Sequence, residues 1–133
     1  GYVGSVLDIG ERRAAEEALR ESEARFREVA DAAPVLIWMS DTTKGCTWVN
    51  RPWLDFTGRD MAEELGDGWV QSVHPDDRER CLATYATAFD TRQPFRMDYR
   101  MRRHDGAWRV IDDTGVPRFA EGGEFLGFIG SCV

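Results

Sequence analysis

The chain has 133 residues, 42% of them hydrophobic and 31% charged, which is enough for one globular domain with a single core. Its formal net charge of −7 argues against a nucleic-acid partner, and the arginine cluster within residues 96–103 is better explained as the solvent-facing side of a strand. No apolar run is long enough to cross a membrane and no signal peptide opens the chain, so we expect no direct membrane contact.

The first seven residues of the chain resemble its last seven. Gly1–Leu7 aligns with Gly127–Val133 through three identical positions and conservative exchanges elsewhere. Such a repeat indicates the end of one module, a connector, and a second module with the same ending. We therefore expect residues 1–9 to be the terminal strand remnant of a preceding repeat, and the chain to be an excerpt from a longer tandem protein.

Residues 10–33 are expected to form a charged linker helix. Glu and Arg recur four residues apart in the favourable order, as in the pair Glu16 and Arg20. Apolar and small residues recur at alternating spacings of four and three, the heptad seam of a two-stranded coiled coil: Ala15, Leu19, Ser22, Phe26 and Val29. The small residues make this seam weak, and the alternative is a single amphipathic helix on its own domain. We expect a dimer contact here.

Short elements follow Pro34, which ends the helix. Residues 35–39 and 46–49 predict a hairpin of two strands. Two short helices are expected next, one capped by Asn50 and closed by Gly58, the other over residues 59–65. A longer helix is expected over residues 75–90, because it starts with a proline and two acids and carries one apolar stripe, made of Leu82, Tyr85, Ala86 and Phe89.

The last third of the chain predicts three strands joined by hairpins. Residues 95–102 alternate between apolar and charged side chains, and an Asp-Gly turn follows. A strand over residues 108–114 is expected to break at Gly115 and Pro117, and residues 125–133 form the last strand. Strands with one apolar face need a cover, so the middle helices are expected to lie on one face of an antiparallel sheet, an α+β fold.

Four segments resemble the PAS family, in particular the sensory-box subgroup common in bacterial receptors. They are Asn50-Arg51-Pro52-Trp53 leading to Thr57-Gly58; Trp69 leading to His74-Pro75-Asp76-Asp77; Tyr99-Arg100-Met101 leading to Asp105-Gly106; and Asp8-Ile9-Gly10-Glu11-Arg12, where Gly10 replaces the usual Thr. The resemblance to one whole domain covers residues 26–133, and we assign residues 34–133 to the PAS domain. Asp8 to Arg12 resembles the segment that ends a preceding PAS domain and starts its signalling helix. It implies a five-stranded antiparallel sheet in the order 2-1-5-4-3 with helices on one face, preceded by the long N-terminal helix.

The resemblance also implies a function. Such a domain is a sensory module of a cytoplasmic bacterial signal-transduction protein, first of all a two-component sensor histidine kinase with several PAS repeats. It detects a signal or small ligand and relays it through dimerised helices. The alternatives are a ligand-free dimerisation or spacer module, and the PAS module of a GGDEF-type diguanylate cyclase. The implied partners are a second copy, bound through the N-terminal helix and the PAS surface, and other PAS and output domains of the same chain. The parent protein can be membrane-anchored elsewhere.

We expect any ligand pocket between the sheet and its helices. The residues expected to line it are Trp38, Trp48, Phe56, Leu65, Trp69, Leu82, Tyr85, Phe89, Met97, Tyr99 and Met101. The alternative is that these side chains simply fill the core. A LOV-type flavin site would need a reactive Cys within residues 58–70, and a haem site usually presents a His from helix 75–90; neither residue is present. We therefore predict no flavin, haem or metal, and leave room for an unidentified small ligand.

The remaining polar residues indicate relay and structure rather than catalysis. Asp8, Ile9, Arg12 and Arg13 are expected to relay the signal where the helix leaves the preceding module. No nucleophile accompanies either histidine, so no catalytic residue is assigned and the chain itself is expected to be non-catalytic. Cys46, Cys81 and Cys132 lack metal-type spacing, which favours reduced thiols of a cytoplasmic protein over a redox switch.

Overall fold

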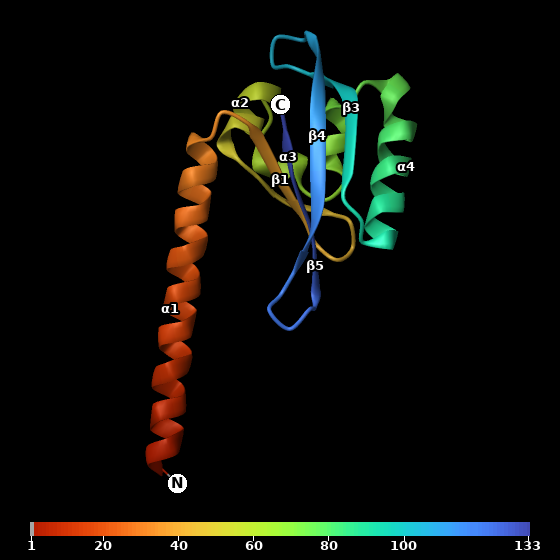
Figure 1. The fold of residues 1–133 in the computed structure, drawn as a ribbon. Coiled ribbons are helices and arrows are strands. Elements are labelled where there is room, and N and C mark those ends of the chain that lie inside the picture. The colour runs from red at the N-terminus through yellow and green to blue at the C-terminus, as the bar shows by residue number, and fades with distance from the viewer. Residues whose placement is uncertain (1) are drawn as a thin grey trace. The chain divides into compact units, whose positions relative to one another are not determined.

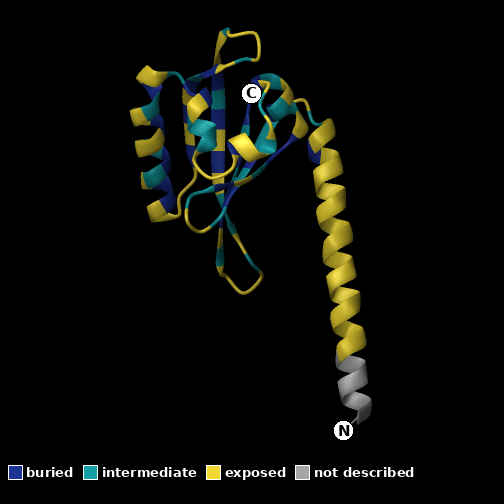
Figure 2. Cartoon of the chain, turned by 180° about the vertical axis from the view of Figure 1, so that it is seen from behind, coloured by how far each residue is buried: buried dark blue, intermediate teal, exposed yellow. Residues whose placement is uncertain are grey.

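The computed structural model describes residues 2–133, with side chains from residue 9 onward. The chain divides into two units, a helical one that ends at Ala32 and a second one over residues 33–133. The first unit is α1 (Tyr2–Ala32), a helix of 31 residues (Figure 1). Of its described side chains, all but that of Ala30 are exposed, as the yellow ribbon in Figure 2 shows.

The strand expected for residues 1–7 is not found, because α1 begins at Tyr2. A helix pairs its backbone N–H and C=O groups within itself, whereas a strand needs a neighbouring strand, and the sheet of the described residues consists of β1 to β5 alone. Its origin in a preceding repeat stays a prediction. The expected relay residue Asp8 lies outside the residues whose side chains are described.

The second unit contains the predicted antiparallel sheet, and its order β2-β1-β5-β4-β3 is confirmed. The strands are β1 (Leu36–Ser40), β2 (Cys46–Val49), β3 (Phe95–Arg102), β4 (Trp108–Phe119) and β5 (Phe125–Cys132). Between β2 and β3 come α2 (Arg51–Thr57), α3 (Met61–Glu64), the 3-10 helix η1 (Gly68–Ser72) and α4 (Pro75–Thr91). Their buried side chains join one hydrophobic cluster with one face of the sheet, so the domain has two layers.

Strand β4 runs past the expected break and continues to Phe119. Its neighbour β3 ends where Phe95 pairs with Gly115, so the remainder of β4 pairs with β5 alone. Pro117 lies in that remainder. There β4 has no neighbour on its β3 side, so no strand on that side needs the N–H that proline lacks. The proline is therefore tolerated inside the strand.

Helix α4 buries a different stripe from the one expected. Its buried apolar positions are Cys81, Tyr85, Ala88 and Phe89, so Tyr85 and Phe89 are buried as expected, whereas Leu82 is 41% exposed. Both stripes have helical spacing, and the sheet selects the one that starts one residue earlier. Figure 2 shows the buried side of α4 turned toward the sheet and its exposed side turned away.

The His-Pro-Asp-Asp motif begins α4 and attaches it to the sheet. His74 caps the helix, with Nδ1 accepting a hydrogen bond of 3.1 Å from the backbone N–H of Asp76. Asp77 accepts two hydrogen bonds of 2.9 Å from the Arg100 guanidinium and one from its backbone N–H, so α4 is tied to β3. These bonds hold the pKa of Asp77 well below its ordinary value.

Two glycines make room for two aromatic rings on the inner face of the sheet. One row across the sheet pairs Trp38 with Gly130, Gly130 with Gly115, and Gly115 with Phe95. A Cβ atom at Gly130 would lie 2.3 Å from the Trp38 ring, and one at Gly115 would lie 2.3 Å from the Phe95 ring. The two rings therefore lie across the glycine backbones, stacked at 6.1 Å between centroids.

No helix within the described chain combines the length and the apolar character needed to cross a bilayer.

Candidate ligand cavity

A small cavity lies between the inner face of the sheet and the helices. Its volume is about 30 Å³, which holds one or two water molecules. The lining is almost wholly apolar and consists of Trp38, Ser40, Lys44, Cys46, Trp53, Trp69, Tyr85, Phe95, Met97, Tyr99 and Asp113. The core is thus nearly filled, with a residual space under aromatic rings.

The one acid in this lining is Asp113 of β4. This residue is only 3% exposed. Its carboxylate accepts a hydrogen bond of 2.8 Å from Trp38 Nε1 and one of 2.9 Å from the Tyr99 hydroxyl. No ion pair among the described side chains includes Asp113. Burial raises the pKa of Asp113 to about 6, although hydrogen bonds from Trp38, Tyr99 and the Cys132 thiol oppose the shift.

The raised pKa predicts that Asp113 makes the domain less stable as pH rises. Below pH 4 the carboxyl is protonated in both the folded and the unfolded chain; between pH 4 and 6 only the folded chain keeps the proton. Ionisation in the folded state therefore costs about 2 to 3 kcal/mol at pH 7. The variant Asp113→Asn should gain that amount relative to wild type between pH 4 and 7, as measured by urea unfolding.

The neighbouring residue supplies the control. Asp112 lies on the outer face, where hydrogen bonds from the Arg96 guanidinium lower its pKa, so its contribution to stability is lost as pH falls. Asp112→Asn should therefore change the pH dependence in the opposite direction. A difference between Asp113→Asn and wild type that stays constant across this pH range would show that Asp113 titrates normally.

A second polar group borders the cavity. The Tyr85 hydroxyl donates a hydrogen bond of 2.8 Å to Ser40 Oγ, which in turn accepts one of 3.1 Å from the backbone N–H of Phe128. The Lys44 carbonyl lies 3.2 Å from the same hydroxyl. Burial raises the pKa of Tyr85 to about 12, so this tyrosine is neutral. The group links β1, β5 and α4 at one edge of the cavity.

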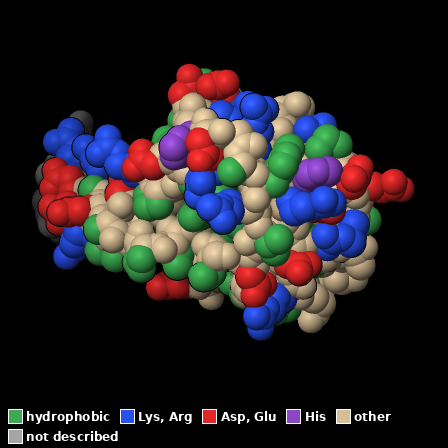
Figure 3. All heavy atoms as spheres, turned by 90° about the horizontal axis from the view of Figure 1, so that it is seen from above, with side chains coloured by type: hydrophobic (Ala, Val, Ile, Leu, Met, Phe, Trp, Pro, Cys, Tyr) green, Lys and Arg blue, Asp and Glu red, His purple; other side chains and the backbone are tan. Residues whose placement is uncertain are grey.

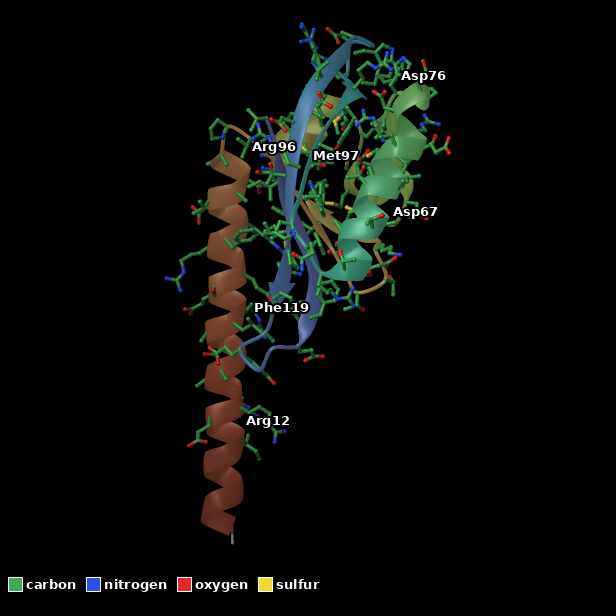
Figure 4. The ribbon with its side chains drawn as sticks, turned by 45° about the vertical axis from the view of Figure 1, so that its right-hand side comes forward. Arg12, Asp67, Asp76, Arg96, Met97 and Phe119 are labelled. Carbon is green, nitrogen blue, oxygen red and sulfur yellow. The ribbon has the colours of Figure 1, made fainter. Side chains whose placement is uncertain are left out.

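The structure brings five of the eleven expected pocket residues to the cavity wall: Trp38, Trp69, Tyr85, Met97 and Tyr99. Figure 4 shows Met97 and its neighbour Arg96 on opposite faces of the sheet. Phe89 and Met101 are buried in the hydrophobic cluster and Phe56 packs against it, but none of the three borders the cavity.

Three expected pocket residues lie elsewhere. Trp48 pairs with Met39, whose side chain faces away from the helices because its neighbours Trp38 and Ser40 face inward. Leu65 follows α3 with extended backbone and is 41% exposed, because that helix ends one residue before it. Leu82 lies outside the buried stripe of α4.

Six residues of the lining were not predicted from the sequence: Ser40, Lys44, Cys46, Trp53, Phe95 and Asp113. For Asp113 the sequence does contain a signal. It lies two residues after the buried Ile111 on β4, and residues two apart on a strand point to the same face, so Asp113 points inward. A charged residue at an inward position is a candidate for a role other than packing.

All three thiols are buried, and burial raises their pKa values. The pKa of Cys46 is raised to about 11 and that of Cys81 to about 12, and that of Cys132 is also raised well above its ordinary value. Because the thiolate is the reactive form, we expect no thiol to react with Ellman's reagent in the folded chain at pH 8 and all three to react in 6 M guanidinium. Fast reaction of one thiol in the folded chain would reopen the redox alternative.

The expected relay and seam residues lie on α1. Ile9, Arg12 and Arg13 are exposed (Arg12 is labelled in Figure 4), and so is the whole expected seam: Ala15, Leu19, Ser22, Phe26 and Val29. Leu19 is 60% and Val29 70% exposed. The structure thus places the expected seam on one helix, with these side chains exposed.

Acidic and basic side chains mix on the face of the molecule seen in Figure 3, with hydrophobic ones scattered between them. No group of His, Cys, Asp and Glu suited to a metal ion occurs among residues 9–133.

The PAS fold family matches residues 47–132, from β2 to the last strand. The chain belongs to the PAS family. Among solved structures, the PAS domain of an HTR-like protein from Haloarcula marismortui has a TM-score of 0.67 at 19% identity, over 91% of this chain and 98% of that one. The Rhodobacter sphaeroides LOV protein has a TM-score of 0.69 at 18% identity, over 85% and 67% of the two chains. These two likenesses concern the fold alone.

Three longer proteins contain a similar segment. The uncharacterized protein y4lL of Sinorhizobium fredii is 46% identical over 97% of this chain and 16% of its own length. The two-component sensor PprA of Pseudomonas aeruginosa is 30% identical over 92% and 14%. The peroxide stress-activated histidine kinase mak1 of Schizosaccharomyces pombe is 24% identical over 98% and 9%. The chain therefore spans less than a fifth of the length of each of these relatives.

Proposed function

We propose that this chain is the sensory module of a signal-transduction protein whose output is a histidine kinase. The observation that carries the proposal is the PAS domain itself, with an aromatic cavity that contains a buried acid. The names of two relatives, a two-component sensor and a histidine kinase, support the output assignment. In this account the chain detects, and a separate domain of the same protein performs the phosphate transfer.

The test of the output uses the full-length protein that contains this segment. Incubated with ATP labelled in the γ-phosphate, it should incorporate the label in an acid-labile form, as expected of phosphohistidine. If it incorporates no label and instead forms cyclic diguanylate from GTP, the output is a diguanylate cyclase and the kinase assignment is wrong.

Signal relay in this proposal runs through paired α1 helices. The heptad spacing of the seam fits a parallel two-stranded coiled coil, and pairing would bury exposed apolar side chains such as those of Leu19 and Val29. A second copy of the chain is the proposed partner. A change at the domain would then rotate or separate the two helices, a small two-state movement that an output domain can follow.

We expect the dimer to depend on this seam. The double variant Leu19→Glu and Val29→Glu should shift the chain from dimer to monomer in sedimentation velocity, because it places like charges against each other at the pairing face. Ala24→Glu, on the opposite side of the helix, is the control and should leave the dimer intact. Equal masses for all three chains would remove the seam from the account.

The second candidate function is a ligand-free spacer that only dimerises. The cavity volume of about 30 Å³ favours it, because most cofactors and metabolites need several hundred Å³. The two candidates differ in what a small molecule does to the chain. A spacer responds to no ligand, whereas a sensory module changes its conformation when a ligand occupies the cavity.

A further inference from the structure

The acid in the cavity has no cation to balance it. Asp113 is 3% exposed, and the groups that donate hydrogen bonds to it are all neutral: Trp38, Tyr99 and the Cys132 thiol. The nearest thiols, Cys81 and Cys132, stay protonated. Buried charges in proteins are normally paired, and a lone one is costly. No positively charged side chain of the described residues therefore compensates the Asp113 carboxylate in this cavity.

The basic residue of the cavity lining, Lys44, already forms an ion pair with another acid. Lys44 borders the cavity, but its Nζ forms an ion pair of 3.0 Å with Asp90 and lies 5.5 Å from the centroid of the Phe89 ring. No other Lys, Arg or His belongs to the lining. A carboxylate has about four acceptor positions, and Trp38, Tyr99 and the Cys132 thiol take three of them, so one further donor can bind.

Aromatic rings surround the same space. Trp38, Tyr85 and Phe95 all line it and contact one another, with centroid distances of 5.8, 5.9 and 6.1 Å, and Tyr85 meets the other two rings edge to face. Ring faces attract cations within about 6 Å, and tryptophan does so most strongly. The wall offers few free oxygens, since Ser40 Oγ and the Tyr85 hydroxyl are bonded to each other. A metal ion needs a shell of several oxygens, whereas an ammonium group is satisfied by one carboxylate and aromatic faces.

We propose that this cavity is a binding site for a small ammonium cation, ammonium itself or methylammonium, with Asp113 as counter-ion and the rings of Trp38, Tyr85 and Phe95 as its walls. A cavity of about 30 Å³ admits one or two non-hydrogen atoms, which limits the ligand to this size. A ligand so small binds with roughly millimolar affinity at best. The inference rests on the proposed sensory function and names the class of ligand that the site takes.

The test is a titration of the 133-residue chain with methylammonium chloride at pH 7.5, followed by the NMR signal of the Trp38 indole N–H. Trp38→Phe identifies that signal among the five tryptophans. We expect a saturable shift with a millimolar midpoint. Sodium chloride at equal ionic strength controls for charge screening, and methanol controls for a neutral molecule of the same size; neither should give a saturable shift.

Two further comparisons test the role of Asp113. At pH 5, below the pKa of about 6, most of the carboxyl is protonated and the midpoint should rise about tenfold. Asp113→Asn should abolish saturation and Asp112→Asn should preserve it; if Asp113→Asn fails to fold, the pH comparison in wild type decides.

An equal response to methanol, or no saturable response at all, would overturn the inference and assign the cavity to water. Either result leaves the kinase and dimer tests unaffected, and a failure of those tests leaves a measured binding constant standing.

Discussion

The variant Gly130→Val should lose about 3 kcal/mol or more of unfolding free energy. A Cβ atom at this position would lie 2.3 Å from the Trp38 ring, and the valine methyl groups would reach further into it. The ring cannot move away cheaply, because its Nε1 is bonded to buried Asp113 and it stacks beside Phe95. Overpacking of this kind typically costs 1–3 kcal/mol, and more when the neighbour is fixed. Urea unfolding followed by circular dichroism measures the loss.

Gly122 provides the matched control for this prediction. It lies in the turn between β4 and β5, and a Cβ atom there would meet nothing within 4 Å. Gly122→Ala should leave the unfolding midpoint within experimental error or raise it slightly. If Gly130→Val unfolds at the same urea concentration as Gly122→Ala, the Trp38 ring does not lie across the strand as described.

The second large effect is expected at Arg59. The Glu64 side chain is fully buried; it accepts hydrogen bonds from Trp53 Nε1, at 3.0 Å, and from Arg59 Nε. Arg59 also donates to the carbonyl oxygens of Glu63 and Gly68, so it joins α3 to η1. Arg59→Met leaves a buried carboxylate without its cation, which costs about 3–5 kcal/mol. The same unfolding measurement detects it.

A double variant separates the lost charge from the lost packing. Glu64→Gln keeps an acceptor for Trp53 and removes the negative charge, so the combination with Arg59→Met should recover at least half of the lost stability. If the double variant is as unstable as Arg59→Met alone, the loss comes from the contacts of Arg59 with the carbonyl oxygens, and the ion pair is not its source.

Local signals were sufficient for most of the fold. Asn50 and Gly58 mark the ends of α2, and Pro75 with its acids marks the start of α4, because caps depend on a few adjacent residues. Alternation in residues 95–102 predicts β3 in the same way. The sheet order came from the resemblance to PAS domains. The strand predicted for residues 1–7 is not found, because α1 begins at Tyr2. These residue types occur in strands and in helices, and only a neighbouring strand would favour the extended form.

The cavity was harder to predict, because it depends on contacts between distant residues. Leu82 and Cys81 are both compatible with a helical stripe, and packing against the sheet selects Cys81. Alternation along β2 does not say which of its two faces is buried, so it cannot place Trp48. The pairing of β1 with β2 also shifts register between Met39 and Ser40, which local sequence does not predict. The volume left over after packing cannot be read from composition, and five tryptophans indicate a filled core as readily as an open one.

The role of the cavity in signalling is tested by comparing two aspartates in the full-length protein that contains this segment. Phosphate incorporation from labelled ATP is measured for wild type, Asp113→Asn and Asp112→Asn. The account predicts a several-fold change for the buried Asp113, because the state of the cavity sets the output, and a wild-type level for the exposed Asp112. Equal levels in all three proteins would contradict it and leave the domain as a spacer that only dimerises.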